Sequence, residues 1–400
     1  MPIKAKILLL GFFLILVIFR IFSGIQTTKF NSGEKVQLEG YLLEEPSLRG
    51  NLSFFSFQGL RVVTTENLHY GDKIKIEGEV DGNKIAFPVV QKLNPGSLLG
   101  ILTTLRREAI ERINRLLPEP QASFLRGVLL GDKSELDSDL RQELIRTGTI
   151  HVIVVSGFNI TLVGGFVLLL AKFIKRRNAV LLSIFAIVLY ILIVGISPPT
   201  LRAAVMGIVA YSASLLGRVV YPLYLLIFAA LVLMIFDPKI ISDVGFQLSF
   251  LATAGILIFG KIFEDKIRRL PSFLSSSVST SLGAQILVVP LIFFYFGNIS
   301  LVSPLVNAAV VWTIPLVTII GFVIVFISFI YFPIAALFTP IIYLAINYFL
   351  VVVDRAAQIP FASVQVEPKN VYLLIGYYLL VLALQIYFQK SRKKKYGQTS

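Results

Sequence analysis

From residue 151 to residue 389 the chain consists mostly of long apolar segments separated by short loops. Each segment is long enough to cross a hydrocarbon core of roughly 30 Å as a helix. The chain of 400 residues is 56% hydrophobic and only 15% charged, which leaves too few charges to cover the surface of a soluble fold of this length. The sequence therefore predicts a polytopic α-helical membrane protein.

We expect about ten membrane spans, the first of which is an apolar run that follows Lys4 and Lys6. This run also has features of a cleaved signal peptide, but Arg20 near its end and the lack of an Ala-x-Ala-like site favour a retained anchor. The expected spans are 7–22, 151–171, 179–196, 199–217, 221–236, 244–262, 277–296, 308–330, 333–353 and 371–389.

The distribution of positive charge predicts the orientation of these spans. The net charge is +14, and most of the excess lies in the tail and in the loops that an even number of spans places in the cytoplasm. Since basic loops favour the cytoplasmic side, we expect both termini in the cytoplasm and residues 29–150 outside. Because membrane orientation accounts for this charge, the charge alone argues only weakly for DNA binding.

The residue types also limit the possible chemistry. The chain has no cysteine and only two histidines, His69 and His151. This excludes disulfides, a thiolate nucleophile and a metal site rich in Cys or His. A phosphate-cradling Gly-rich loop, a dinucleotide fingerprint and a His-Glu-x-x-His motif are also absent from the sequence. We therefore expect no enzyme activity, no cofactor and no bound metal.

Residues 29–97 change to a period of two, with alternating apolar and polar side chains from Val36 to Leu42. We expect five short strands, the last at 84–93 after a hairpin turn at 81–83. They suit a small extracytoplasmic all-β barrel of the oligonucleotide/oligosaccharide-binding (OB) type. Its aromatic side chains either stack on bases or, as the slightly negative domain charge favours, fill the barrel or pack on the membrane domain. These residues are Phe54, Phe55, Phe57 and Tyr70.

Two amphipathic helices are expected next. Residues 98–117 have one apolar face, on which we place Leu102 and Leu105, whereas Arg106 is expected in water. After a short apolar segment at 124–130, Asp137 is expected to cap a second helix that stops near Gly148. Since neither amphipathic helix is apolar enough to span, we place both on the outer membrane surface.

These patterns divide the chain into five regions. They are a membrane anchor (1–28), the β domain (29–97), the surface helices (98–150), a multi-span domain (151–390) and a basic cytoplasmic tail (391–400).

Polar residues around the start of the second expected span form the first candidate site. Polar groups at membrane depth are costly unless they have a partner or a function. They either line a transport path or have a structural role, in which the small residues allow close helix packing and the polar side chains form hydrogen bonds between helices. A Ser–His hydrolase is disfavoured, because Ser156 and His151 are five residues apart and therefore about 140° apart around a helix, so they do not face each other. The candidates are Thr149, His151, Ser156, Gly157 and Asn159.

The other candidates lie farther along the chain. Arg202 either forms a structural ion pair with Asp243 or attracts phosphate groups from a cavity. The polar residues Gln247, Ser249 and Asn307 either line the same path or join helices by hydrogen bonds. Glycine, asparagine and proline interrupt the stretch 297–315, which predicts a kinked or re-entrant element there.

Five short stretches carry a resemblance to a known family. They are Leu129–Asp132, Thr147–Gly157, Ser197–Ala203, Phe246–Leu251 and Ile299–Asn307. In this order, and behind an anchor and a small β domain, they resemble the ComEC-type competence family of bacterial inner-membrane channels for single-stranded DNA. The family's usual Ser-Gly-Leu-His reads Ser156-Gly157-Phe158-Asn159 here, which keeps a hydrogen-bonding position but removes a titratable group.

The resemblance implies passage of single-stranded DNA into the cytoplasm during natural transformation, driven by a cytoplasmic helicase-like motor. Larger family members also carry a metallo-β-lactamase-like domain, so we expect this chain to work with a separate nuclease or a DNA-receptor protein. Two alternatives remain open. One is a permease or exporter of a smaller anionic solute or envelope precursor, and the other is a non-conducting membrane scaffold.

Overall fold

The computed structural model describes residues 31–43, 45–49, 52–66, 68–93, 98–132, 136–153, 157–267, 269, 271–365 and 370–396. The expected anchor at 7–22 and the candidate Ser156 lie outside these residues. The chain divides into two compact units. The first comprises residues 1–141, 150–247 and 312–351, and the second comprises residues 142–149, 248–311 and 352–400.

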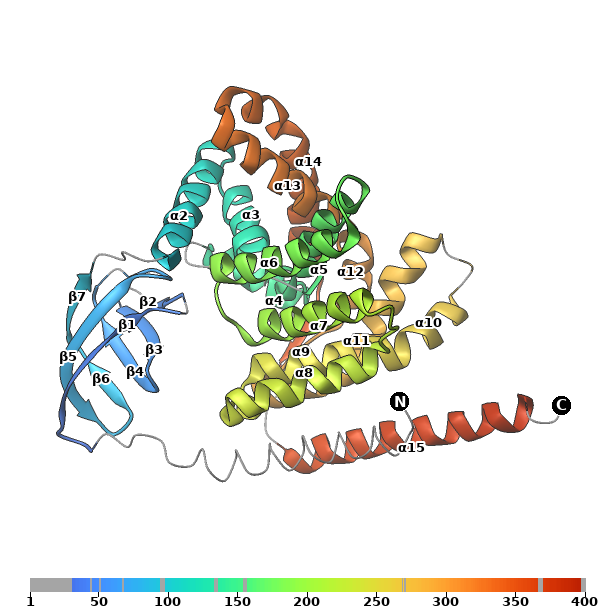
Figure 1. The fold of residues 1–400 in the computed structure, drawn as a ribbon. Helices are drawn as coiled ribbons and strands as arrows, with labels where there is room; N and C mark the ends of the chain where they lie inside the picture. The colour runs from blue at the N-terminus through green and yellow to red at the C-terminus, as the bar shows by residue number, and fades with distance from the viewer. Residues whose placement is uncertain are drawn as a thin grey trace. The chain divides into compact units, whose positions relative to one another are not determined.

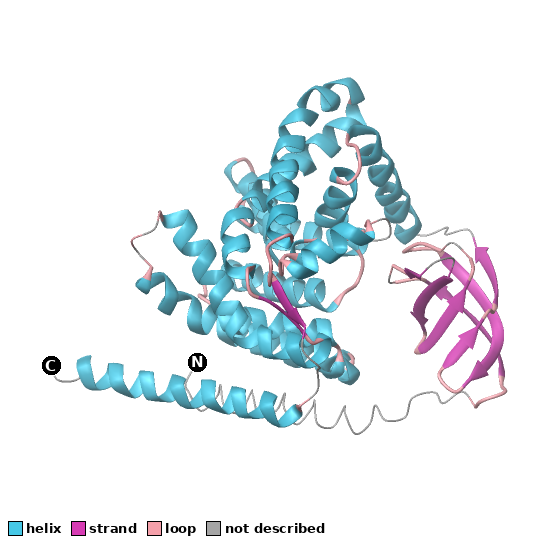
Figure 2. Cartoon of the chain, turned by 180° about the vertical axis from the view of Figure 1, so that it is seen from behind, coloured by secondary structure: helices cyan, strands magenta, loops and turns pink. Residues whose placement is uncertain are grey.

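The β domain of the first unit is a half-barrel built from seven strands (Figure 2). The sheet order is β1-β5-β6-β4-β3-β2, and β7 also pairs with β5. The strands are β1 (Lys35–Tyr41), β2 (Ser47–Arg49), β3 (Leu52–Phe57), β4 (Leu60–Thr64), β5 (Lys73–Asp81), β6 (Lys84–Ala86) and β7 (Val89–Leu93).

The prediction of five strands is therefore wrong, because the domain has two more strands than expected. The three-residue strand β2 is too short to show a period, and the expected last strand divides at Phe87-Pro88 into β6 and β7. Proline has no N–H to donate to a ladder, and Phe87 has a φ of 51°, so regular pairing stops there. The predicted turn at 81–83 is confirmed, since Asp81 pairs with Lys84.

The aromatic side chains of the β domain mostly fill its interior. Phe55, Phe57 and Tyr70 are buried, and Phe55 and Phe57 belong to one core with Ile74 and Ile76. The interpretation that they fill the domain is confirmed for Phe55 and Phe57, whereas Tyr70 packs against α2 (Leu98–Leu116) and α6 (Arg176–Val194), where Arg106 lies over its ring and its hydroxyl donates to Leu192 O. Stacking on bases is wrong for them, because their faces are not accessible.

The first unit contains a short buried helix, α3 (Gln121–Leu130). All ten of its residues are buried, and it contacts α2, α6 and α13 (Figure 1). The expected helix at 98–117 is confirmed as α2, but Arg106 is only 4% exposed, so its predicted position in water is wrong. The helices assigned to this unit are α2 (Leu98–Leu116), α5 (Gly157–Leu168), α6 (Arg176–Val194), α7 (Pro198–Leu215), α8 (Pro222–Phe236) and α13 (Thr313–Ile330).

The second unit contains a helix interruption that the sequence predicts. Helix α11 (Ser272–Phe296) ends at Gly297, whose φ is 64°, and the short strand β8 (Asn298–Ser300) pairs with β9 (Ser363–Gln365) before α12 (Ser303–Val310) begins. This unit also holds a π-helical segment at Ile256–Gly260, α10 (Lys261–Lys266) and α15 (Val371–Tyr396). Helices α4 (Ser138–Arg146), α9 (Val244–Gly255) and α14 (Phe332–Ala357) run across the division between the units.

Six helical segments among the described residues are long and apolar enough to cross a membrane. They correspond to six of the expected spans. Two further apolar helices, Pro222–Phe236 and Val371–Gln385, are shorter, and the expected span at 199–217 forms α7 without meeting these criteria. The six segments are Ile150–Leu168, Arg176–Val194, Val244–Lys266, Ser275–Phe296, Thr313–Ile330 and Phe332–Ala357.

Two tyrosines attach α15 to α11 at a proline. Pro290 cannot donate to the carbonyl of Ile286, four residues earlier. The Tyr377 hydroxyl donates to this carbonyl at 3.1 Å, and the Tyr378 hydroxyl donates to the carbonyl of Leu287 at 2.7 Å. We expect the double substitution Tyr377→Phe and Tyr378→Phe to remove about 1 kcal/mol per bond and to speed hydrogen exchange in α15. Tyr372→Phe, in the exposed first turn of α15, is the control and should leave exchange unchanged.

Candidate functional site

The C-terminal end of α3 is held by side chains from three other helices. The last carbonyls of a helix have no partner within it, so a buried end requires donors from elsewhere. Asn159 of α5 donates its Nδ2 hydrogen to Val128 O at 2.7 Å, and the Tyr190 hydroxyl of α6 donates to Leu129 O at 2.9 Å. Arg106 of α2 donates from Nη2 to Leu130 O at 3.4 Å. Asn159 therefore has a structural partner in this fold.

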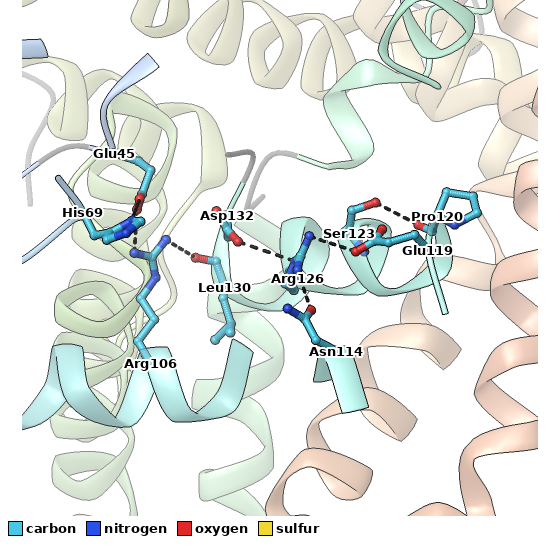
Figure 3. Close-up of polar contacts among 10 residues, drawn as sticks. All are labelled: Glu45, His69, Arg106, Asn114, Glu119, Pro120, Ser123, Arg126, Leu130 and Asp132. Atoms are coloured by element: carbon cyan, nitrogen blue, oxygen red, sulfur yellow. Dashed lines mark hydrogen bonds and ion pairs between the residues drawn. The ribbon is translucent and has the colours of Figure 1, made fainter. Parts of the chain in front are cut away.

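A buried arginine occupies the middle of the same helix (Figure 3). Arg126 is 1% exposed, and its guanidinium contacts Asn114, Glu119 Oε1 at 3.1 Å and Asp132 Oδ2 at 3.6 Å. Asp132 is itself buried, just beyond the left-handed cap at Gly131. Sequence reasoning missed this cluster, although one charged residue within the apolar run 124–130 was a usable signal.

Arg106 makes a second charged cluster with the β domain (Figure 3). Its Nη1 atom lies 2.7 Å from Glu45 Oε2, and its guanidinium lies 5.1 Å from the centre of the Tyr70 ring. His69 Nδ1 lies 3.6 Å from the other oxygen of Glu45. Burial, the largest influence on Glu45, raises its pKa, but His69 and Arg106 together lower that pKa below its ordinary value.

The structure brings two of the predicted site residues together in the first unit. A Cβ atom on Gly157, at the start of α5, would lie 3.5 Å from Arg202 Nη2. Within the part of the chain that the structure describes, Asp243 and Arg202 do not form the predicted ion pair. Asp243 instead caps α9, where its carboxylate accepts from the Phe246 N–H at 2.7 Å. Gln247 donates to Ile241 O at 2.8 Å. His151 is exposed in the 3-10 turn at Ile150–Val152.

The second unit contains a neutral polar cluster between α11 and α12. Asn307 donates to Ser281 Oγ at 3.1 Å and to Ser303 Oγ at 3.2 Å. Gln285 donates to the same two hydroxyls, at 3.2 and 3.0 Å. Three buried oxygens of β8 and α12 have no hydrogen-bond partner among the described residues, and the one that belongs to this cluster, Asn307 Oδ1, can accept from a further donor. They are Asn298 Oδ1, Ser300 Oγ and Asn307 Oδ1.

The segment around Gly148 lies against this cluster. Gly148 has a φ of 71°, and a Cβ atom there would lie 2.5 Å from Ser303 Oγ, so only glycine fits. This confirms the predicted stop of the helix near Gly148. Thr149 is buried and shares a 2.9 Å hydrogen bond with Thr147, whereas Ser249 accepts from Thr253 through its carbonyl at 3.0 Å.

Within the described residues, no group of three or more His, Asp and Glu side chains is placed to hold a metal ion. The clusters offer two kinds of chemistry instead. The charged clusters at Arg106 and Arg126 are occupied by carboxylates, and the cluster at Asn307 offers uncharged donors and acceptors. Arg202, in the second turn of α7, places a cation beside Gly157 at the start of α5, and the start of a helix favours anions.

Comparison with known proteins gives matches over much of the chain. A family model described as Competence protein matches residues 128–391. ComE operon protein 3 of Bacillus subtilis is 26% identical over 210 residues, covering 52% of this chain and 26% of the relative. Competence protein ComA of Neisseria gonorrhoeae is 29% identical over 220 residues, covering 51% of this chain and 30% of the relative.

An uncharacterized protein of Aquifex aeolicus is 30% identical over 174 residues, covering 43% of this chain and 39% of the relative. The matches thus span well under half the length of each of these relatives. Among solved structures, none matches this chain significantly.

Proposed function

The chain belongs to the competence protein family, and on that premise we propose that it is a channel for single-stranded DNA in the bacterial inner membrane. The observation that carries the proposal is the family match over residues 128–391, which includes all six helical segments of the described residues that are long and apolar enough to cross a membrane. The names of two relatives, a competence protein and a com-operon product, fit this role.

In this proposal about ten spans form the channel, and both termini lie in the cytoplasm. The β domain forms an OB-like receiving module on the outer side. Arg202 contacts phosphates of the strand, and the neutral cluster at Asn307 offers hydrogen bonds to sugars and bases. A helicase-like motor and a separate nuclease or DNA receptor complete the pathway, since the sequence contains no Gly-rich phosphate-binding loop.

The test is protected uptake of labelled single-stranded DNA into liposomes that contain the purified protein. Duplex DNA and empty liposomes are the controls. We expect uptake of the single strand alone, with a strong dependence on salt. No single-strand uptake together with flux of nucleotides or other small anions would support a permease instead.

Replacing Arg202 gives a sharper form of this test. A charge-assisted contact to phosphate contributes about 1.5–3 kcal/mol, so Arg202→Ala is expected to reduce uptake by roughly tenfold or more. Arg218→Ala, at an exposed position just after α7, is the matched control and should leave uptake near the wild-type level. Equal uptake by both variants at equal protein level would rule out the phosphate contact.

A further inference from the structure

One side chain of α2 ties the β domain to the end of α3. The Arg106 guanidinium binds Glu45, lies over the Tyr70 ring and donates to Leu130 O. Because this guanidinium is almost fully buried, loss of Glu45 as its partner would leave an uncompensated charge inside the fold. Movement of the β domain away from α2 would therefore also disturb the end of α3.

The loop at 68–72 makes the second attachment of the β domain. The Tyr70 hydroxyl donates to Leu192 O of α6 at 2.8 Å. Gly71 has a φ of 84°, and a Cβ atom there would lie 1.9 Å from Thr103 Cγ2 of α2. The loop thus sits directly on α2 and α6, with His69 at its edge.

His69 is the residue at this junction whose ordinary pKa lies near neutrality. Its side chain is 42% exposed, so its proton exchanges with solvent, and it faces the Glu45 carboxylate. Its backbone N–H donates to Asp72 at 3.0 Å, and Asp72 in turn pairs with Lys92 at 3.3 Å and Arg107 at 3.8 Å. With Glu45 and Arg106, these are the charged groups that surround His69.

We propose that Glu45, His69 and Arg106 form a proton-controlled latch between the β domain and the helices. With His69 protonated, Glu45 bridges two cations and holds the β domain on α2. When His69 releases its proton to solvent, Glu45 retains Arg106 alone, and the junction loosens. Since Arg106 also holds Leu130 O, the state of the latch reaches the end of α3, where the family match begins.

The direction of the effect follows from the neighbours of His69. The interaction with Glu45 is the largest influence on His69 and raises its pKa above the ordinary 6.5, against the effect of burial. A group with a raised pKa contributes stability that is fully present below its unfolded value and is lost as pH rises through the raised value. The latch is therefore tight below the ordinary pKa of 6.5 and loosens as the pH rises through the raised pKa of His69.

The lack of cysteine makes a direct test possible. Spin labels on Lys84→Cys in β6 and Glu111→Cys in α2, both exposed positions, report the distance between the β domain and α2 by pulsed EPR. We expect a narrow distance distribution at about pH 6 and a broader one at about pH 8.5. His69→Gln should give the same distribution at both pH values.

His151→Gln is the matched control, because His151 is the other histidine of the chain and lies exposed in a different segment. It should leave the pH effect intact. A distribution that is identical at both pH values in the parent protein, or a pH effect that persists in His69→Gln, would overturn the latch. The readout involves no DNA, so it is independent of the proposed transport function.

Discussion

Replacing Arg126 with leucine is expected to lower the free energy of unfolding by about 3–5 kcal/mol, one of the largest effects that we expect for a single substitution in this protein. The guanidinium is 1% exposed, and Asp132 beside it is 5% exposed. Removing the cation leaves a carboxylate inside the fold without its main counter-charge, which is far more costly than losing a pair in water. The measurement is denaturant or thermal unfolding of the purified protein in detergent.

Arg115→Leu is the matched control, because Arg115, like Arg126, is an arginine on a helix that pairs with a glutamate. Its partner is Glu111 at 3.7 Å, but the two side chains are 71% and 67% exposed. An exposed pair of this kind contributes less than about 1 kcal/mol. A third variant, Arg126→Leu with Asp132→Leu, should recover part of the loss because it removes both buried charges. If Arg126→Leu costs no more than Arg115→Leu, the buried cluster does not stabilise the fold.

Repeating patterns made much of the secondary structure predictable. The two-residue alternation between Val36 and Leu42 predicted β1, and the amphipathic period after residue 98 predicted α2. The glycine and prolines around Gly297 predicted the interruption between α11 and α12. These features follow from short-range rules, because period, caps and missing N–H groups act within a few residues.

The polar contacts of the site could not be predicted in the same way. Arg106 and Glu45 are 61 residues apart in the sequence. The amphipathic period of the helix that contains Arg106 predicted that this side chain faces water. The three side chains that donate hydrogen bonds to the end of α3 come from three different helices, so no local sequence pattern predicts them. Such pairs depend on tertiary contacts between distant segments, which short-range sequence rules do not reveal.

The structure also gives a physical reason why asparagine is acceptable at position 159. Its contact with Val128 O requires one N–H donor of suitable length. The histidine that is usual in the resembling family can supply such a donor as well, so this role does not need a titratable group. Proton transfer at this position is therefore not required for α3 to be held by α5.

The close approach of α11 to the end of α9 and to the π-helical segment Ile256–Gly260 leads to the second large prediction. A Cβ atom on Gly255 would lie 2.3 Å from the carbonyl oxygen of Gly283, and a Cβ atom on Gly283 would lie 3.0 Å from Gly260 N. The obstacles are backbone atoms of a neighbouring helix, so no side-chain rotation can relieve the clash. We expect Gly255→Ala to cost about 3 kcal/mol of unfolding free energy by forcing the helices apart.

Gly376→Ala provides the matched control for this substitution. Gly376 lies within α15, and a Cβ atom there meets nothing within 4 Å. Alanine favours a helix over glycine by about 1 kcal/mol, so this variant should be as stable as the parent or more stable. Thermal unfolding of both variants in one detergent separates the close approach of the helices from the general effect of adding a methyl group. Equal stability of the two variants would mean that Gly255 and the backbone of α11 at Gly283 do not lie in close contact.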